Sequence, residues 1–284
     1  QGRVEEHLKR LFAAAPGVAA VEGGRLTGYI GVWPADDLRG TGLPGVYSPE
    51  WGHAAIEEQR LPIYRALYRS AAALWTDAGA RMHALSLLAH DRVGVEAWFC
   101  NGFGLTVVDA MRWIEPVDSA GDPALTIRKA SVDEAEVLSS LDVQHNQHYV
   151  QPPVFMGQRH SQSPAERVTF MQQGANSIWA AYDGDRPVGF IQFEPDSTDA
   201  SILVRSKDTV AITGAYLQPA YRRQGLGKAI LFKALEEYDR LGFRRCSVDF
   251  ESFNPEAASF WPRFFQPVCY SLTRVPESFR SLLK

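Results

Sequence analysis

The sequence predicts an α/β protein built from two domains in tandem. The chain has 284 residues, which suits two ordinary domains better than one. Short β-rich runs alternate with amphipathic helical runs along most of its length. Residues 56–114 and 219–274 show the same succession of helix, strand, short helix and strand, at a shift of about 163 residues. We therefore expect a first domain over residues 1–118 and a second over 124–284.

The first half opens with a helix that Pro16 and Gly17 end, because proline cannot continue a helix and glycine favours its terminus. Residues 22–25, Glu-Gly-Gly-Arg, are typical of a hairpin turn. A loop rich in glycine and proline then leads to a long helix, a buried strand, a short helix and a last strand. The predicted helices span residues 4–15, 56–78 and 93–100, and the predicted strands span 18–21, 26–33, 45–48, 84–89 and 105–114.

Residues 115–123 have no apolar period and contain two prolines and a glycine, which indicates a linker. After it, Ser131 and Glu134 have the spacing of a capping box at the start of a helix. The turn residues at 183–186, Asp-Gly-Asp-Arg, predict a hairpin. The predicted strands of this part span residues 125–129, 177–182, 187–193 and 201–205, and the predicted helices span 131–149 and 163–173.

The most informative stretch is residues 211–242. An apolar strand at 211–217 ends before Pro219, which has no N–H to donate to a sheet. The loop Gly225-Leu226-Gly227 then leads into an amphipathic helix. A helix N-terminus presents free backbone N–H groups and partial positive charge, and glycines let an anion approach the backbone. We therefore expect a phosphate or pyrophosphate here. Full positive charges are added by Arg222, Arg223 and Lys228.

Two familiar glycine loops do not fit this stretch, since a Walker loop has four residues between its glycines and a dinucleotide loop has three glycines. The order Arg-x-x-Gly-x-Gly after a strand resembles the coenzyme A pyrophosphate loop of the GNAT superfamily of acyl-CoA N-acyltransferases. A second motif of that superfamily, Asn-x-x-Ala-x-x-Phe, is matched by residues 254–260, after a β-rich run at 246–251. Asn254 is also a good helix N-cap, with Pro255 at the first helical position. The resemblance covers about residues 125–274 and, with the repeat, implies two tandem GNAT-like domains with mixed sheets.

The resemblance implies that acetyl-CoA, the expected cosubstrate, lies between two splayed parallel strands at 211–217 and 246–251. Backbone groups near Leu217 would pair with the pantetheine arm, the loop amides would hold the pyrophosphate, and the second motif would flank the thiol. The expected acetyl-CoA-binding residues are Tyr216, Leu217, Arg222, Arg223, Gln224, Gly225, Leu226, Gly227, Lys228, Asn254, Ala257 and Phe260.

Direct attack of an amine on the thioester requires that the amine be neutral, which calls for a base. Asp249 and Glu251 lie on one face of their strand, and carboxylates are unusual in a parallel strand unless they serve a function or sit at its solvated end. We expect Glu251, or failing it Asp249, as the base, with Tyr270 as a proton donor. His145 and His148 are alternatives, unless they are ordinary polar residues of their helix.

The sequence departs from the resemblance at two places. Trp261 stands where a tyrosine acid is expected, and Phe265-Gln266 replaces a Gly-Phe pair that the first domain keeps as Gly102-Phe103. In the first domain, Pro62-Ile63-Tyr64 occupies the position of the glycine loop, so the phosphate cradle is lost. We therefore expect a degenerate first domain that serves as a structural partner and borders the acceptor site.

The composition limits the kinds of partner that the protein is expected to bind. A net charge of −4 disfavours a broad nucleic-acid surface. No apolar run approaches the roughly 18 residues of a membrane helix, and no His/Cys spacing indicates a metal site. Cys100, Cys246 and Cys269 are predicted to be buried thiols in a reducing cytoplasm.

The expected function is that of a cytoplasmic N-acetyltransferase moving acetyl from acetyl-CoA to a primary amine. We expect the amine on a small molecule, with a protein N-terminus or lysine as the other acceptor considered. A catalytically silent CoA-binding regulatory or scaffold protein is the alternative. The sequence leaves the acceptor's identity and the oligomeric state open.

Overall fold

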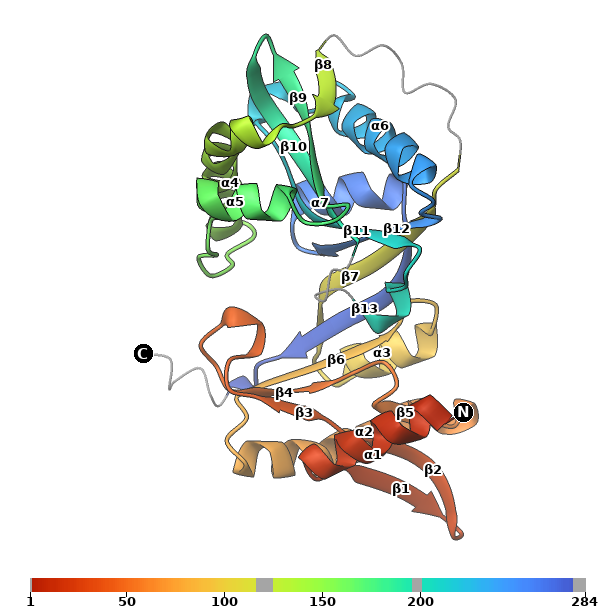
Figure 1. Cartoon of the computed structure of the whole chain (residues 1–284). Coiled ribbons are helices and arrows are strands. Elements are labelled where there is room, and N and C mark those ends of the chain that lie inside the picture. Colours follow the sequence, from red (N-terminus) through yellow and green to blue (C-terminus); the bar gives the residue numbers. More distant parts are fainter. Residues whose placement is uncertain (1, 116–124, 196–200, 278–284) are drawn as a thin grey trace. The chain divides into compact units, whose positions relative to one another are not determined.

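The structure is a computed structural model that describes residues 2–115, 125–195 and 201–277 (Figure 1). The chain divides into two compact units. The first consists of Gln1–Val108 and Pro267–Lys284, and the second of Asp109–Gln266. Nearly all of the predicted linker at 115–123 lies outside the described residues.

The first unit contains two sheets. Its helices are α1 (Gly2–Ala14), α2 (Arg60–Asp77) and α3 (Arg92–Cys100). One antiparallel sheet has the order β1-β2-β5, formed by Val18–Glu22, Arg25–Ile30 and His53–Ala55. The other runs β3-β4-β6-β13, formed by Trp33–Ala35, Gly45–Ser48, Met82–Leu88 and Gln266–Arg274, with β4 and β6 parallel. Strand β7 (Gly104–Trp113) begins in this unit. The sequence did not predict the short strands β3 and β5.

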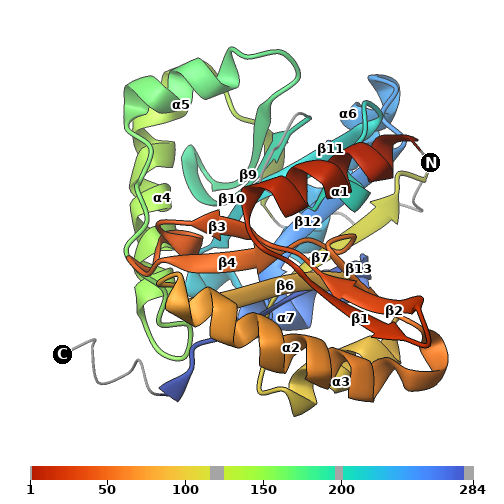
Figure 2. The ribbon, with the colours of Figure 1, turned by 90° about the horizontal axis from the view of Figure 1, so that it is seen from below.

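Aromatic side chains fill the core of the first unit. Trp98 on α3 is fully buried, and the rings of Tyr64 and Tyr68 on α2 lie 4.9 and 6.0 Å from it. Helix α2 packs against α3, β1 and β2, as seen from below in Figure 2. Leu272 of β13 belongs to the same core and is also fully buried. The chain's last strand is therefore part of the first unit's packing.

The internal repeat is visible in the element bounds. Strands β6 and β12 begin at residues 82 and 245, and helices α3 and α7 begin at 92 and 255, so each pair is 163 residues apart. The last strand of each repeat, however, passes to the other unit. Strand β13 pairs with β6, from Cys269 facing Leu88 to Arg274 facing His83. The Ile114 N–H, just after β7, donates to the Arg244 carbonyl in the second unit.

This exchange makes the compact units differ from the expected ranges of 1–118 and 124–284. The expected boundary followed the linker composition, which reports where the chain lacks a regular element. Strand pairing is a long-range property, and the apolar alternation of β13 suits any sheet with an open edge. The sequence therefore shows that the strand exists but does not show which unit it joins.

The second unit has one mixed sheet. Its strand order is β8-β9-β10-β11-β12, followed by the part of β7 from Asp109 onward; the pairs from β8 to β11 are antiparallel, and β11 and β12 are parallel. The strands are Thr126–Lys129, Ser177–Asp183, Arg186–Glu194, Thr209–Leu217 and Arg245–Glu251. The helices are α4 (Ala135–Val150), α5 (Pro164–Met171), α6 (Leu226–Arg240) and α7 (Pro255–Phe260). The strand predicted at 201–205 is wrong, because Ile202–Val204 form a single 3-10 turn.

Helices cover both faces of this sheet (Figure 1). Ile178 of β9 packs with Leu138 of α4, while the neighbouring Ser177 hydroxyl lies 2.8 Å from the Tyr238 hydroxyl of α6. Because adjacent strand residues point to opposite faces, α4 and α6 lie on opposite sides of the sheet. Helix α5 packs beside α4.

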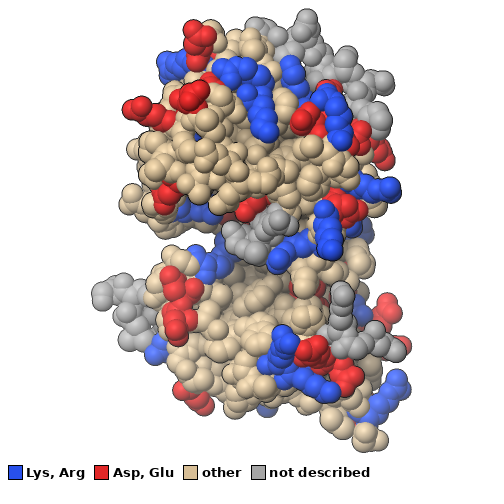
Figure 3. Space-filling model, viewed as in Figure 1, with Lys and Arg blue, Asp and Glu red and all other residues tan. Residues whose placement is uncertain are grey.

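Several sequence expectations concern the surface. Cys246 and Cys269 are buried as predicted, but Cys100 is exposed, because it lies at the end of α3 on the face turned away from Trp98. Among the described residues, no helix combines the length and apolarity needed to cross a membrane. In the view of Figure 3, acidic and basic side chains are interspersed on each unit, and neither sign covers a broad area.

The exchanged strand gives a stability prediction. Leu272→Ala leaves a cavity in the first unit's core, and it should lower the free energy of unfolding by about 2–5 kcal/mol. Hydrogen exchange should show loss of protection in β6 and α2, while β9 and β10 stay protected. Leu241→Ala, at a side chain that is 54% exposed, is the control and should change little. Loss of protection mainly in β9 and β10 would contradict the assignment of β13 to the first unit.

Candidate acyl-CoA site

Two parallel strands separate in the middle of the second unit. Pairing of β11 with β12 runs from Thr209 opposite Arg245 to Ile212 opposite Val248, and then ends although both strands continue. A β-bulge coincides with this point, since Phe193 of β10 faces Ile212 while Gln192 faces Gly214, leaving Thr213 as the extra residue. A bulge bends its strand and increases the local twist. The residues of β11 after Ile212 therefore turn away from β12 and leave an edge without a strand partner.

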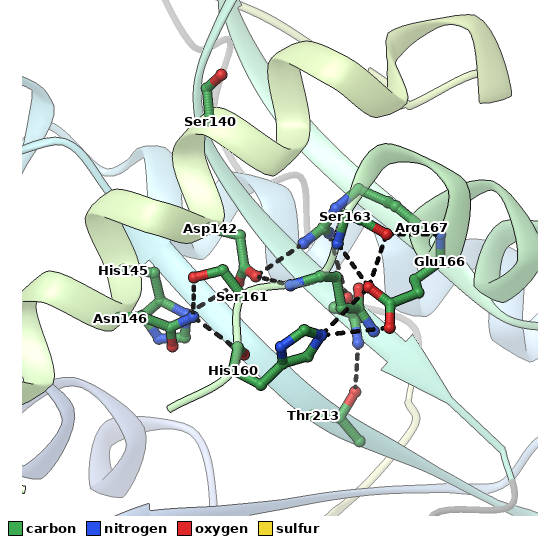
Figure 4. Close-up of polar contacts among 12 residues, drawn as sticks. Ser140, Asp142, His145, Asn146, His160, Ser161, Ser163, Glu166, Arg167 and Thr213 are labelled. Atoms are coloured by element: carbon green, nitrogen blue, oxygen red, sulfur yellow. Dashed lines mark hydrogen bonds and ion pairs between the residues drawn. The ribbon is translucent and has the colours of Figure 1, made fainter. Parts of the chain in front are cut away.

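A buried ion pair between Arg167 and Asp142 supports the bulge (Figure 4). The Arg167 side chain on α5 is fully buried, and its Nη2 lies 3.2 Å from Asp142 Oδ2 on α4. Its Nη1 donates to Gln192 Oε1 at 3.4 Å, and Gln192 Nε2 donates to Thr213 Oγ1 at 3.1 Å. Removing one member of a buried pair leaves an uncompensated charge, so such a network resists distortion. The position of the bulge is thus tied to two helices.

The glycine loop ends in the N-terminus of α6. Gly225 is the N-cap with φ +81°, and Arg223 has φ +62°, a left-handed conformation that is costly for arginine. The first N–H groups of α6, at Leu226, Gly227 and Lys228, have no acceptor within the helix. A Cβ built on Gly227 would lie 3.2 Å from the Phe260 ring of α7, so a larger residue would crowd this approach. The loop has the geometry of an anion site.

The three basic residues of the loop differ in their engagement. Arg223 and Lys228 are exposed. Arg222 is half-buried, and its Nε donates to the Leu217 carbonyl at 2.9 Å, while its Nη1 donates to Glu256 Oε1 at 2.8 Å. The sequence analysis gave all three the same role, but in the structure Arg222 already has protein partners.

The second motif forms the short helix α7 next to this loop. Asn254 is buried and caps the helix, accepting the Ala257 N–H at 3.4 Å. Phe260 faces Gly227, and its ring lies 4.8 Å from that of the buried Trp261. The structure thus brings Phe260 next to Gly227 of the glycine loop, a contact that the sequence did not predict.

The two predicted carboxylates lie on β12 beyond its paired part. Glu251 is buried at 8% exposure, and no hydrogen bond or ion pair is found for its carboxylate among the described residues. Asp249 differs, because it is exposed and has the charged groups of Asp109, Glu251 and Arg159 nearby. Desolvation raises the pKa of Asp249 to about 7, and the nearby charges of Asp109 and Glu251 add to the shift. An ionisable group that titrates near neutral pH suits proton transfer.

Three further residues join this cluster, and the sequence analysis did not find them. Asp109 of β7 is buried, which raises its pKa, and it accepts the Ser201 N–H at 2.8 Å. Burial raises the pKa of Tyr149, at the end of α4, and the charge of Glu251 raises it further. The Arg159 guanidinium lies 5.1 Å from the centre of the Tyr149 ring. These residues lie on separate elements, so no local pattern signals that they meet.

The loop that carries Arg159 is fastened to α4. Asn146 Nδ2 donates to Ser161 Oγ at 2.8 Å, and the Gln162 N–H donates to Asp142 Oδ2 at 2.9 Å (Figure 4). Asp142 is also the partner of Arg167, so one carboxylate fastens this loop and supports the bulge. The loop and the parted strands are therefore held by a common network.

The remaining predicted residues lie in different surroundings. His145 is buried, with Asp142 3.7 Å away and the rings of Tyr149 and Tyr216 at 4.9 and 5.8 Å. His148 Nε2 lies 3.5 Å from Asn254 Oδ1. Tyr270 belongs to the other compact unit, where it pairs with Leu87 and packs against that unit's core. We therefore assign no step of the chemistry to Tyr270.

Comparison with known proteins agrees with this geometry. Residues 145–265 match the model of the acetyltransferase (GNAT) family, and this range contains the parted strands, the glycine loop and α7. This part of the chain is a GNAT domain. The fold and family support acyl-CoA-dependent N-acyl transfer in general.

Solved structures resemble the GNAT domain together with the first unit. A GCN5-related N-acetyltransferase from Sphaerobacter thermophilus has a TM-score of 0.57 at 11% identity, over 95% of this chain and 84% of that one. The glucosamine N-acetyltransferase region of a fungal multi-domain beta-N-acetylglucosaminidase has a TM-score of 0.52 at 13% identity, over 95% of this chain and 34% of that one. At such identities the likeness shows the fold, which is that of GNAT acetyltransferases over nearly the whole chain. No curated protein matched the chain.

The chemistry of the GNAT domain's side chains does not indicate a metal. Among the residues that the structure describes, no three His, Cys, Asp or Glu side chains are grouped so that they could hold a metal ion. The carboxylates near Asp249 instead face Tyr149 and Arg159.

The loop assignment can be tested with Gly227→Glu. The new carboxylate would stand where the α6 N–H groups point, so CoA affinity should fall by about 100-fold or more, the size expected for losing two charge-assisted hydrogen bonds. Calorimetric titration with acetyl-CoA measures this, and circular dichroism checks the fold. Gly227→Ala is the control, because it adds the same Cβ beside Phe260 without a charge and should still bind measurably. Unchanged affinity in Gly227→Glu would show that the loop is not the site.

Proposed function

We propose that the protein transfers the acetyl group of acetyl-CoA to a primary amine of a small molecule by direct attack. One observation supports this above all: β11 and β12 part beside the glycine loop, and the parted segment of β12 carries Asp249 and Glu251. An opening between two strands, a phosphate cradle at one end and a carboxylate at the other suit a long thioester and an amine.

Acetyl-CoA would bind along the parted strands. Its pyrophosphate would accept hydrogen bonds from the N–H groups at the start of α6, with Arg223 and Lys228 nearby. The pantetheine arm would pair with the free edge of β11 near Tyr216 and Leu217. Asn254, Ala257 and Phe260 would line the thiol end from α7.

The reaction would proceed in one attack without a covalent enzyme intermediate. The amine nitrogen bonds to the carbonyl carbon, a backbone N–H of β11 past the bulge stabilises the oxyanion, and the C–S bond then breaks. The base takes a proton from the nitrogen. CoA leaves as a thiolate and is protonated afterwards, and because a thiol pKa is near 8.5, a dedicated acid is dispensable. Trp261 in place of a tyrosine is compatible with this reaction.

Asp249 is our first choice for the base, which reverses the order expected from the sequence. Its carboxyl is reached by water, so an acceptor or an ordered water can meet it, and its pKa of about 7 suits proton transfer at neutral pH. Glu251 is buried beside Tyr149 and would contribute charge to the acceptor's surroundings.

The base has a signature in the pH profile. Asp249 acts as a base only when ionised, so kcat/KM should rise with pH, bend near pH 7 and level off above it. Asp249→Asn should remove the bend and lower kcat/KM about 100-fold or more at pH 7, with the loss shrinking toward the amine's own pKa. Free-thiol release from acetyl-CoA with a panel of amines measures both.

Glu251→Gln is the matched comparison, because it removes a neighbouring carboxylate from the same strand. It should lower the pH of the bend, since one source of repulsion on Asp249 is gone. Full activity in both variants at pH 7 would place the base elsewhere, with His145 or His148 next to test. Acetyl-CoA binding without thiol release for any amine would instead favour a silent CoA-binding protein.

The first unit should not bind CoA. At its corresponding helix, α2, Pro62 lacks an N–H, and Ile63 and Tyr64 are buried in the core. Pairing of its parallel strands β4 and β6 ends at Ser48 and Leu85, and just beyond this point His53 Nε2 lies 2.9 Å from the Ser86 carbonyl. A side chain of the unit itself thus lies at the point where these two strands part.

The consequence is a stoichiometry of one. Titration of the whole chain with CoA should give a ratio near one per chain. Gly227→Glu should abolish all binding rather than half of it, because the second unit holds the only cradle that we propose. A ratio near two, or half the binding left in Gly227→Glu, would show that the first unit has kept a site.

A further inference from the structure

The contact between Arg222 and Glu256 connects the two walls of the parted strands. Arg222 lies in the loop after β11, and its Nε donates a hydrogen bond to the Leu217 carbonyl at the end of that strand. Glu256 lies in the first turn of α7, which follows β12. Because the same guanidinium donates to Glu256 at 2.8 Å, the end of β11 and the start of α7 are joined across one side chain.

A third element reinforces this contact. His148 of α4 has its Nε2 3.7 Å from Glu256 Oε2 and 3.5 Å from Asn254 Oδ1. Glu256 therefore lies between a cation on the loop and an imidazole on α4, and each of its oxygens faces one of them. These three side chains therefore link the end of β11, the start of α7 and α4.

The contact between Arg222 and Glu256 also lies on the path that acyl-CoA would take under the proposed function. The pantetheine arm would run along β11 to Leu217 and pass α7 at Asn254, the two points that Arg222 and His148 touch. The side chains of Arg222 and Glu256 are only 26% and 46% exposed, yet the pair remains open to water. Ion pairs of this kind are weak, so an arriving phosphate can compete with the carboxylate for the guanidinium.

We propose that Glu256 holds Arg222 as a strap across the acyl-CoA opening, and that the strap must release before acyl-CoA can enter. The inference rests on the proposed function, since it assumes that acyl-CoA uses this opening. Glu256 then governs the rates of CoA entry and exit without taking part in the chemistry. It is a residue that regulates binding, and neither family motif includes it.

The experiment is stopped-flow measurement of CoA association with the whole chain. Glu256→Gln keeps the shape but removes the charge that holds Arg222, and Arg222→Met removes the other partner. Glu256→Gln should associate about two- to fivefold faster than the unsubstituted chain, the size that a half-exposed ion pair can provide. When Arg222→Met is already present, adding Glu256→Gln should bring no further acceleration, because no guanidinium is left for Glu256 to hold. Glu236→Gln, on the exposed face of α6, removes the same charge elsewhere and should leave the rate unchanged.

The outcomes separate the strap from the proposed function. Association that is unchanged or slower in Glu256→Gln overturns the strap while leaving the acyl-CoA site intact. The same acceleration by Glu256→Gln in the Arg222→Met background also overturns it, because the two side chains then act independently. Failure of the unsubstituted chain to bind CoA at all overturns the proposed function and the strap together.

Discussion

The bulge at Thr213 is the constraint on which the GNAT domain depends. A parallel pair of strands in register has no room between its members, because each backbone group bonds to the neighbour. One extra residue in β11 breaks the register toward β10 at the position where pairing with β12 ends. Past this position, the side of β11 that faces β12 is a free strand edge within the sheet, and this edge lies beside the N-terminus of α6. Under the proposed function, an extended cosubstrate would bind along that edge.

The bulge is supported by a charged side chain, Arg167, that is buried in the core. A fully buried arginine is costly, and Arg167 is compensated by Asp142 and by the Gln192 amide. The same Asp142 accepts a backbone N–H of the loop that carries Arg159. Strand geometry and the loop bordering the carboxylates are thus coupled through one side chain. A change at Asp142 would disturb both, although it touches neither the glycine loop nor Asp249.

The electrostatics of the site also depend on which residues the fold brings together. Asp109, Asp249 and Glu251 lie near one another. Desolvation raises the pKa of Asp249 to about 7, and the nearby charges of Asp109 and Glu251 add to that shift, while the positive charge of Arg159 lowers the pKa. Under the proposed function the Asp249 carboxylate would act as the base. The sheet brings these residues together, since β12 supplies two of the three.

The features that were predictable from the sequence are those that depend on short-range interactions. Apolar periods, proline stops and capping residues gave the order of nearly all elements, and the repeat gave the tandem plan at a shift of 163 residues. The glycine loop and the Asn254 cap are short patterns whose meaning depends on few neighbours. Asp249 and Glu251 were found because alternation along one strand shows which residues share a face.

Contacts between segments that are distant in the sequence could not be predicted in this way. Strand β13 could have completed either sheet by its pattern, and it joins β6 because its buried face, with Leu272, fits the first unit's core. Tyr149, Arg159 and Asp109 gather around β12 from three other elements, and Arg222 pairs with Glu256 across the opening. Ion pairs and strand edges are chemically generic, so many partners would satisfy them. The choice among partners is made by packing, which no short stretch of sequence records.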